Sequence, residues 1–446
     1  MKLSRYNIIS NNSYTRGGED ENYKIYYNTL SAKSIAIKTS HHEEILSGNL
    51  KEIPNDIENY LIKNKFLTDK NYDEELYAAI EFQRLNAEDP TFRSFILLPT
   101  QWCNLGCDYC GQSHFRSPLS KNHREIVRRR VLEAINTESV NTVSIGWFGG
   151  EPLVAYKAIL DLSKEFISEA EGTCNYSAHI VTNGSLLTED KIYSLINDCN
   201  ITRFDITIDG TKETHDSHRP SKKPGGSFDK IIDSLRIFKN GRFTVEPVVI
   251  IRVNLDNRNY RDIKNLVKYL YDKDLVSPRF EFNIAPIYSW SNDISSIELS
   301  QEEFSNIELD IFNDLNKYGF FYNVFPDRPM GVLCSAVTRN SEVVSATGNI
   351  FSCTEYPLVV EHEKNDSLTN LISLGIPTLR PKHQFDDWLI DIEQGNFPCN
   401  KCSFFPVCGG SCPKQWHNNV SPCPSYKYAP QKRLDHIAML SGLRVK

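Results

Sequence analysis

The sequence lacks any long hydrophobic run. Its first residues, MKLSRYNIISNNSYTRGGEDENY, contain no continuous apolar segment of the kind found in a signal peptide. No later run reaches the roughly 18 apolar residues that a membrane-spanning helix needs. We therefore expect a cytoplasmic protein that has no membrane partner.

The sequence also lacks an excess of basic residues. It has 50 Lys and Arg against 57 Asp and Glu, a net charge of −7, which argues against nucleic acid as a general partner. With 22 Gly, 21 Pro and 40% hydrophobic residues among 446, it is neither collagen-like nor disordered. A chain of this length is expected to fold as two or three domains.

Cysteine, by contrast, is plentiful and clustered. In a reducing compartment disulfides are rare, so the spacing of the 12 cysteines indicates metal ligation or catalysis. Only Cys174 and Cys199 stand alone. Three cysteines lie in the segment CNLGCDYC, and seven lie in the last quarter of the chain: Cys103, Cys107 and Cys110, then Cys334, Cys353, Cys399, Cys402, Cys408, Cys412 and Cys423.

The first 90 residues form a unit of their own. The segment YKIYYNTLSAKSIAI alternates as two short strands around NTLSAK, and IPNDIENYLIKNKFLTD and DEELYAAIEFQRL have helical spacing. This order predicts a winged-helix-like module in residues 1–90. A structural extension with no binding role is the alternative.

Strands alternate with helices from residue 91 to about 320, which predicts parallel strands joined by crossover helices. Six repeats favour an α/β fold with a partial (β/α)6 TIM-like barrel, and the strands are SFILLPT, TVSIGWF, YSAHIVT, ITRFDITI, FTVEPVVIIRVN and RFEFNIAPI. The segments QWCNLGCDYC and GGEP follow the first two strands, at the strand ends where such barrels place their chemistry. Residues 321–446 are rich in Cys, Pro and Gly, and we expect them to need metals for a stable shape.

The cysteine triplet can hold three irons of a 4Fe-4S cluster and leave the fourth iron open. An incomplete zinc site or three ordinary cysteines are the alternatives. The spacing C-x3-C-x2-C, with Tyr109 before the last cysteine, resembles the signature of the radical S-adenosylmethionine (SAM) superfamily. That resemblance implies that the open iron binds SAM and that the reduced cluster cleaves it to a 5′-deoxyadenosyl radical.

The segment GWFGGEP follows the second strand, where Gly149 and Gly150 would allow close approach to a ligand and Glu151 could accept from an amine. It resembles the GGEP motif that holds the SAM amino group in that superfamily. The resemblance further places Asn183 and Thr207 near the SAM ribose or carboxylate, with Arg219 or Arg252 pairing with the carboxylate. We expect His215 and His218 to lie in a surface turn without a ligand role.

The C-terminal cysteines resemble the seven-cysteine SPASM extension, although their spacing alone also fits a pair of zinc sites. The resemblance gives a first auxiliary 4Fe-4S cluster to Cys334, Cys353 and Cys412. It gives a second, fully ligated one to Cys399, Cys402, Cys408 and Cys423. The segment CSAVTRN has no further cysteine for the first cluster, whose fourth iron is therefore open or bound by another group.

SPASM-bearing relatives mostly modify ribosomally made peptides, and many recognise a leader sequence through an N-terminal winged-helix module. We therefore expect a maturase that oxidatively cross-links side chains of a precursor peptide through thioether or carbon–carbon bonds, cyclophanes included. The electron would pass to the auxiliary clusters, and a flavodoxin- or ferredoxin-type partner would reduce the enzyme.

Two further expectations concern the chemistry inside the barrel. Cys174 and Cys199 precede their strands, which places both thiols at the end of the barrel away from the motifs and argues against epimerisation. Glu281, on the sixth strand, is the candidate proton acceptor, and a structural role in which an arginine pairs with it is the alternative.

The functional alternatives are an anaerobic sulfatase-maturing enzyme that makes formylglycine and a maturase of a peptide-derived redox cofactor. A zinc-stabilised binding scaffold without catalysis is the alternative from outside the enzymes.

Overall fold

Parallel strands form the centre of the protein. The computed structural model describes residues 1–17, 20–116, 118–376 and 379–446. The strands run in the order in which they occur in the chain, all parallel: β7 (Phe92–Leu97), β8 (Thr142–Trp147), β9 (Asn175–Thr182), β10 (Ile201–Thr207), β11 (Val248–Leu255) and β12 (Phe280–Pro286). The six predicted strands and the partial-barrel α/β fold are therefore confirmed.

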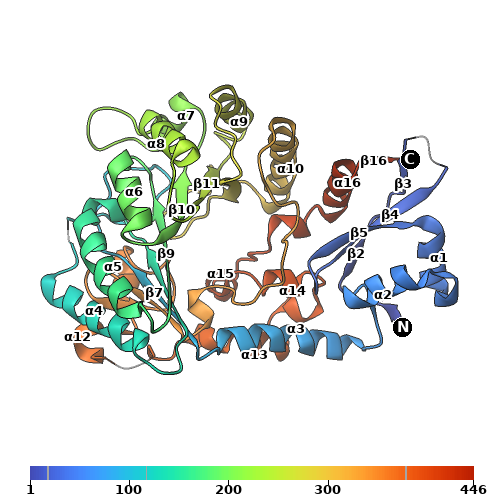
Figure 1. The fold of residues 1–446 in the computed structure, drawn as a ribbon, viewed down its shortest axis with the longest axis horizontal. Coiled ribbons are helices and arrows are strands. Elements are labelled where there is room, and N and C mark those ends of the chain that lie inside the picture. The colour runs from blue at the N-terminus through green and yellow to red at the C-terminus, as the bar shows by residue number, and fades with distance from the viewer. Residues whose placement is uncertain (18–19, 117, 377–378) are drawn as a thin grey trace.

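Helices cover the outer face of this sheet (Figure 1). They are α4 (Lys121–Ile135), α5 (Tyr156–Ala170), α6 (Glu189–Asn197), α7 (Lys212–His218), α8 (Phe228–Asn240), α9 (Ile263–Asp272) and α10 (Gln301–Tyr318). Their boundaries follow from capping. Ser120 accepts from the backbone N–H of His123 at the start of α4, and Ser300 and Glu303 form a capping box at the start of α10.

One apolar core lies between the strands and these helices. Along β9 buried and more accessible residues alternate, because successive side chains of a strand point to opposite faces. Ala178 and Ile180 of β9 belong to the core, as do Ile159 and Phe166 of α5. This packing fixes the carboxyl ends of the strands, and with them the loops that carry the motifs.

The N-terminal module has the strand-then-helix order that the sequence indicates. Its strands are β1 (Lys2–Leu3), β2 (Asn7–Ile9), β3 (Tyr14–Arg16), β4 (Asn22–Asn28), β5 (Lys33–Lys38) and β6 (Leu67–Thr68), and its helices are α1 (Thr39–Ser47), α2 (Asn55–Lys63) and α3 (Tyr72–Ala87). Strand β4 is central and pairs with β2, β3 and β5. Among the described residues β5 pairs with β4 alone, so one edge of β5 is open.

The C-terminal third contributes strands to both sheets. Strand β13 (Ser341–Val344) pairs in parallel with β7, and β14 (Asn349–Phe351) and β15 (Thr369–Asn370) extend the central sheet to nine strands. Strand β16 (Leu443–Val445) pairs with β3, so the end of the chain lies on the N-terminal module (Figure 1). The C-terminal segment, which the sequence analysis separates at about residue 320, thus shares one sheet with the barrel and another with the N-terminal module.

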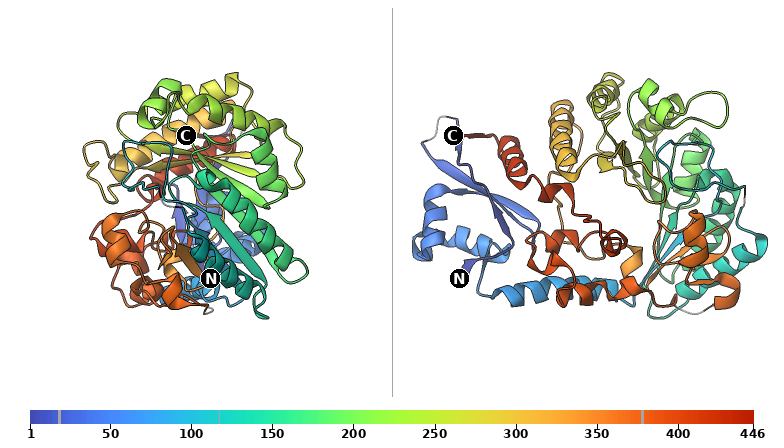
Figure 2. Two further views of the ribbon diagram at one scale, coloured as in Figure 1. Left: turned by 90° about the vertical axis from the view of Figure 1, so that its left-hand side faces the viewer. Right: turned by 180° about the vertical axis from the view of Figure 1, so that it is seen from behind.

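Short helices make up the cysteine-rich segment. They are α11 (Val360–Asn365), α12 (Leu371–Leu374), α13 (Trp388–Glu393), α14 (Phe405–Cys408), α15 (Pro413–His417) and α16 (Pro430–Leu440). Helix α3 contacts α13 and α14 and runs from the N-terminal module to the barrel along one side of the molecule (Figures 1 and 2). Among the described helices, none is both long and apolar enough to cross a membrane.

Candidate functional site

A cavity of about 340 Å³ lies at the carboxyl ends of the barrel strands. All three cysteines of the triplet line it. So do seven of the eight residues that the SAM resemblance singles out: Tyr109, Gly149, Gly150, Asn183, Thr207, Arg219 and Arg252. These residues come from six loops or strands, so the fold brings together what the sequence separates.

Backbone contacts hold the triplet loop in place. Leu105 bridges Ser221 in antiparallel fashion, the N–H of Gly106 donates to the Pro220 carbonyl at 2.8 Å, and the N–H of Lys222 donates to the Asn104 carbonyl at 2.9 Å. Burial raises the pKa of Cys107 to about 12. Since iron binds the thiolate, this cysteine needs the metal to compensate the buried negative charge.

The two glycines of the GGEP motif lie against the start of the triplet loop. Gly149 has φ +124°, a region that favours glycine, and a Cβ on Gly150 would lie 2.7 Å from the carbonyl oxygens of both Gln101 and Trp102. A side chain at position 150 would push away the segment that leads into Cys103. The two glycines thus let the triplet loop pack closely against the end of β8, and their close approach to a ligand stays a prediction.

Glu151 does not line this cavity. Its carboxylate is buried and accepts three hydrogen bonds from the protein: from Thr182 Oγ1 at 2.7 Å, from Asn183 N at 2.7 Å and from Leu153 N at 3.0 Å. These bonds position the end of β9, and the acceptance of a bond from a ligand amine stays a prediction.

A buried polar network closes one wall of the cavity. The Tyr109 hydroxyl donates to Asp209 at 2.6 Å and accepts from Arg219 and from Asn254 Nδ2. The Nε of Arg219 has no hydrogen-bond partner within the described residues, although it is buried. A buried guanidinium with an unsatisfied donor suits an anionic ligand such as a carboxylate. The alternation of β11 offers a signal for Asn254 that sequence reasoning missed, because it shares a face with Arg252.

His215 and His218 are a correction. Both are buried, and they lie on α7 instead of in a surface turn. The Nδ1 of His215 accepts from the Asp209 backbone at 3.2 Å, and its Nε2 is 2.9 Å from Ser227 Oγ. Burial lowers the pKa of His215 well below its ordinary value. The side-chain bonds of His215 thus fix the loop after β10.

The cavity continues into the barrel. A second hollow of about 650 Å³ shares Phe148, Val181, Thr207, Arg252, Asn254 and Glu355 with the first. Its wall also carries His179 and the ion pair between Arg203 and Asp205, whose atoms are 3.0 Å apart. The space next to the triplet is thus large enough for a substrate as well as a cofactor.

Glu355 lies in the site, although the sequence did not point to it. It follows Cys353 by two residues and lines both hollows. Burial raises the pKa of its carboxyl above the ordinary value, and Lys414 and Arg252 oppose that shift only in part. No ion pair or side-chain hydrogen bond of its carboxylate is found in the described part of the chain. Its position is set by tertiary packing, so no local motif pointed to it.

Glu281 lies elsewhere. It belongs to the first half of β12, whereas Ala285, Pro286 and Ile287 from the other end of that strand line the cavity. Its carboxylate accepts from Asn323 Nδ2 at 3.3 Å. The geometry gives the predicted proton acceptor no place at the triplet.

Four C-terminal cysteines surround a small cavity of their own: Cys399, Cys402, Cys408 and Cys423. This is the set assigned to the second auxiliary cluster. Burial raises the pKa of Cys399 and of Cys408 to about 12, and the neighbouring thiols add to both shifts. Lys427 Nζ donates to Cys423 Sγ at 3.1 Å, as a cation stabilising a thiolate would. The residues present fit a buried iron–sulfur group.

The other three C-terminal cysteines, Cys334, Cys353 and Cys412, lie near one another. Burial raises the pKa of Cys334 to about 11, and the nearby Cys412 adds to this shift. Burial also raises the pKa of Cys353, and the nearby Cys334 adds to that shift. Across the described residues, no three cysteine, histidine or acidic side chains converge closely enough to hold a single metal ion. A tetrahedral zinc ion needs its thiolates at about 2.3 Å.

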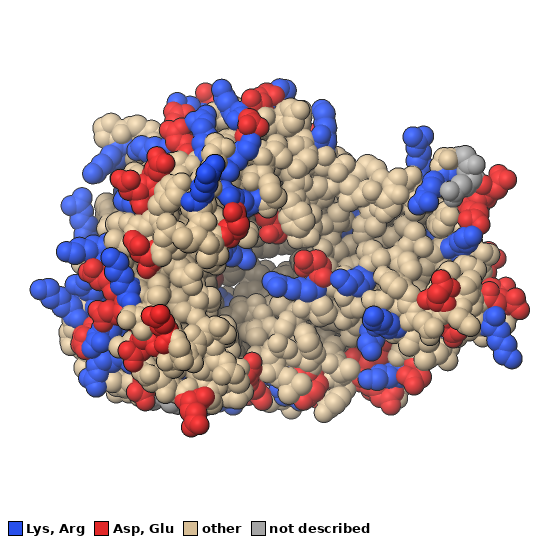
Figure 3. All heavy atoms as spheres, viewed as in Figure 1, with Lys and Arg blue, Asp and Glu red and all other residues tan. Residues whose placement is uncertain are grey.

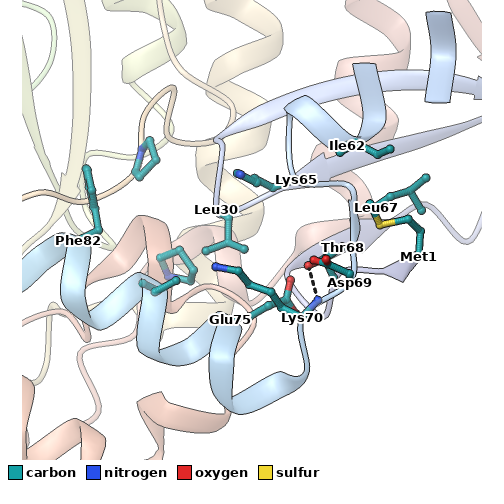
Figure 4. Close-up of a pocket in the computed structure, with 14 residues that line it drawn as sticks. Met1, Leu30, Ile62, Lys65, Leu67, Thr68, Asp69, Lys70, Glu75 and Phe82 are labelled. Atoms are coloured by element: carbon teal, nitrogen blue, oxygen red, sulfur yellow. Dashed lines mark hydrogen bonds between the residues drawn. The ribbon is translucent and has the colours of Figure 1, made fainter. Parts of the chain in front are cut away.

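A separate pocket of about 290 Å³ lies where the N-terminal module meets α3. Apolar side chains line much of it, among them Met1, Leu30, Ile62, Leu67, Ala79 and Phe82. Lys65 and Lys70 border it (Figure 4). Figure 3 shows that one face of the molecule is also hollowed at its centre, between the barrel and this module.

Comparison with known proteins gives a match within the barrel. Residues 97–270 match the model of the radical SAM superfamily. The chain carries a radical SAM domain. The recognition based on the triplet and the GGEP motif is thereby confirmed, and so is the expectation of a radical SAM enzyme.

Relatives share the domain at low identity. A serine-type anaerobic sulfatase-maturating enzyme from Bacteroides thetaiotaomicron is 23% identical over 70% of this chain and 80% of its own length. The radical SAM cyclopropyl synthase TigE from Paramaledivibacter caminithermalis is 24% identical over 67% of this chain and 64% of its own.

Two solved structures share the fold. Native anSMEcpe with bound AdoMet and Cp18Cys peptide has a TM-score of 0.58 at 19% identity, covering 79% of this chain and 98% of its own. Streptococcus suis SuiB bound to precursor peptide SuiA has a TM-score of 0.50 at 15% identity, covering 94% of this chain and 97% of its own.

Proposed function

We propose that this protein is a radical SAM maturase that oxidatively cross-links side chains within a ribosomally made precursor peptide. The observation that carries the proposal is the continuous cavity, which joins the triplet and its SAM-type residues to the barrel interior and to Glu355. The names of TigE and of SuiB with its precursor peptide SuiA support a peptide substrate.

When bound, SAM and the triplet's cluster supply a 5′-deoxyadenosyl radical that removes one hydrogen atom from the substrate, and auxiliary clusters can accept one electron. The chain's own residues orient these groups. Tyr109, Arg219 and Asn254 form the wall against which an anionic group can bind, and Gly149 and Gly150 keep the triplet loop close to the end of β8.

We assign to Glu355 the role of proton acceptor. Closing a new bond after one hydrogen atom is lost releases a further proton and one electron. A carboxylate that lines the cavity and forms no ion pair with any described residue can take this proton when it is ionised. Because Glu355 is two residues from Cys353, the proton and electron would leave the substrate on the same side.

The N-terminal module would bind the leader. An extended peptide can add to the open edge of β5 through backbone hydrogen bonds. The apolar pocket beside α3 can take an apolar side chain of the same peptide.

The test is anaerobic incubation of reconstituted protein with SAM, reductant and peptides encoded beside the gene. We expect loss of two hydrogen atoms from one peptide, with 5′-deoxyadenosine formed alongside, and fragmentation that stops between the joined residues. Formation of 5′-deoxyadenosine with every such peptide unchanged would count against the proposal.

A second candidate, formylglycine formation in sulfatases, is favoured by two relatives. The Bacteroides enzyme and a cysteine-type enzyme from Clostridium novyi, 24% identical over 76% of this chain and 94% of its own, both bear sulfatase-maturating names. Oxidation of serine to formylglycine also removes two hydrogen atoms, so mass alone does not separate the candidates. A hydrazide probe does, since only formylglycine carries an aldehyde.

A further inference from the structure

An exposed basic cluster lies beside the triplet and has no part in the proposed handling of SAM or the peptide. It consists of Arg116, Lys222 and Lys223, and all three side chains are exposed. The Lys222 ammonium lies 4.3 Å and the Arg116 guanidinium 4.9 Å from the centre of the Trp102 ring. Trp102 immediately precedes Cys103, so two cations cover the residue next to the first cluster ligand.

The basic cluster is built into the triplet loop. Segment 218–222 runs antiparallel to segment 104–108, joined by the backbone bonds of Gly106 and Lys222 and by Asp108 N donating to the His218 carbonyl at 3.1 Å. Lys222 Nζ also donates to the Cys103 carbonyl at 3.1 Å. These contacts hold Lys222 against the triplet loop.

The charge of this surface is not neutralised locally. Within the described residues, none of the three cations forms an ion pair, and the neighbouring Asp108 is already paired with Arg258 at 2.6 Å. The whole chain has a net charge of −7, so an acidic protein would on average be repelled. A basic cluster on such a background directs an acidic partner to one place. The exposed Phe115 beside Arg116, with 57% of its surface accessible, adds an apolar contact.

We infer that the basic cluster is the docking surface for an acidic one-electron carrier protein of the flavodoxin or ferredoxin class, which reduces the triplet's cluster from this side. The inference rests on the proposed function, because only a redox cluster in this loop needs an electron donor. It places the donor at the barrel, away from the C-terminal cysteines.

The test is charge reversal away from the residues that hold the loop. Arg116→Glu with Lys223→Glu changes the net charge by four and keeps Lys222, whose ammonium supports the Cys103 carbonyl. The matched control is Arg129→Glu with Lys164→Glu, the same charge change on the exposed surface of α4 and α5. SAM cleavage is measured with reduced flavodoxin at limiting concentration and, separately, with dithionite.

We expect kcat/KM for flavodoxin to fall at least ~10-fold in the Arg116/Lys223 variant and to lose most of its salt dependence. The dithionite rate should not change, and the control variant should resemble the wild type. An unchanged flavodoxin rate would overturn the inference, as would an equal loss with both reductants or a loss confined to peptide binding. Wild-type protein that fails to cleave SAM with dithionite would overturn the proposed function, and the inference with it.

Discussion

Replacing Glu355 by glutamine is the change whose outcome depends most on the site geometry. Glutamine keeps the size and the cavity lining but cannot accept a proton. General base catalysis contributes about 10²–10⁴-fold, so Glu355→Gln should slow peptide modification by that factor, about 3–5 kcal/mol in the barrier. SAM cleavage needs no proton acceptor on the substrate and should stay within about threefold of wild type.

The assay follows both products in one anaerobic reaction, 5′-deoxyadenosine by chromatography and modified peptide by mass spectrometry. Glu355→Gln should uncouple them, with several nucleosides formed per modified peptide. Glu281→Gln is the matched control, since the same substitution at a carboxylate outside the cavity should leave both products unchanged. Wild-type coupling in Glu355→Gln, or uncoupling in Glu281→Gln, would refute the assignment.

The pH dependence of the same reaction gives a second readout. Burial raises the pKa of Glu355 above its ordinary value of 4.5, and only the deprotonated form accepts a proton. Peptide modification should therefore rise with pH through the raised pKa and fall in acid while SAM cleavage persists. A modification rate that is flat from neutral pH down to pH 4.5 would contradict this role.

The remaining predictions concern metal ligation, loop packing and stability. Cys107→Ala should abolish SAM cleavage, whereas Cys353→Ala should retain some cleavage and lose modified peptide, with both products followed by chromatography and mass spectrometry. Gly150→Ala should weaken SAM binding measured by calorimetry, because its Cβ meets two backbone carbonyls at 2.7 Å. Arg130→Met should lower the apparent free energy of unfolding in denaturant by about 3–5 kcal/mol, because it leaves Glu342 buried without its partner.

Each of these has a control on the same chain. Gly17→Ala should leave SAM binding unchanged, because an added Cβ meets no described residue beyond its chain neighbours within 4 Å. Arg128→Met removes a partly exposed ion pair and should cost at most about 1 kcal/mol. Equal losses of cleavage in the two cysteine variants would contradict their assignment to different clusters, and equal stabilities of the two arginine variants would contradict the importance of the buried ion pair.

Local sequence patterns predicted the barrel strands well. They could not predict the strands whose partners lie far away in the sequence. Strands β7 to β12 were predictable because each is a short apolar run followed by a helix of period 3.6. Strands β13 and β16 were not, since each pairs with a strand far away in the sequence and carries no local signal for that partner. The interlocking of the two ends of the chain follows from those two pairings.

The residues of the candidate site also fall into those that the sequence could predict and those that it could not. The triplet and the GGEP segment have fixed spacings, so their residues could be identified from sequence. Glu355 reaches the cavity only because β13 and β14 place the segment after Cys353 against the barrel, which no spacing records. His215 has polar neighbours in sequence, but its burial is set by contacts with Asp209 and Ser227.

The most direct measurement of the central claim is the anaerobic reaction of wild-type reconstituted protein with SAM, reductant and the neighbouring precursor peptide, read by tandem mass spectrometry. The account predicts a peptide that has lost two hydrogen atoms, is unreactive toward hydrazide and resists fragmentation between two joined residues, with 5′-deoxyadenosine formed in step. Protein that binds zinc in place of iron and cleaves no SAM would contradict it.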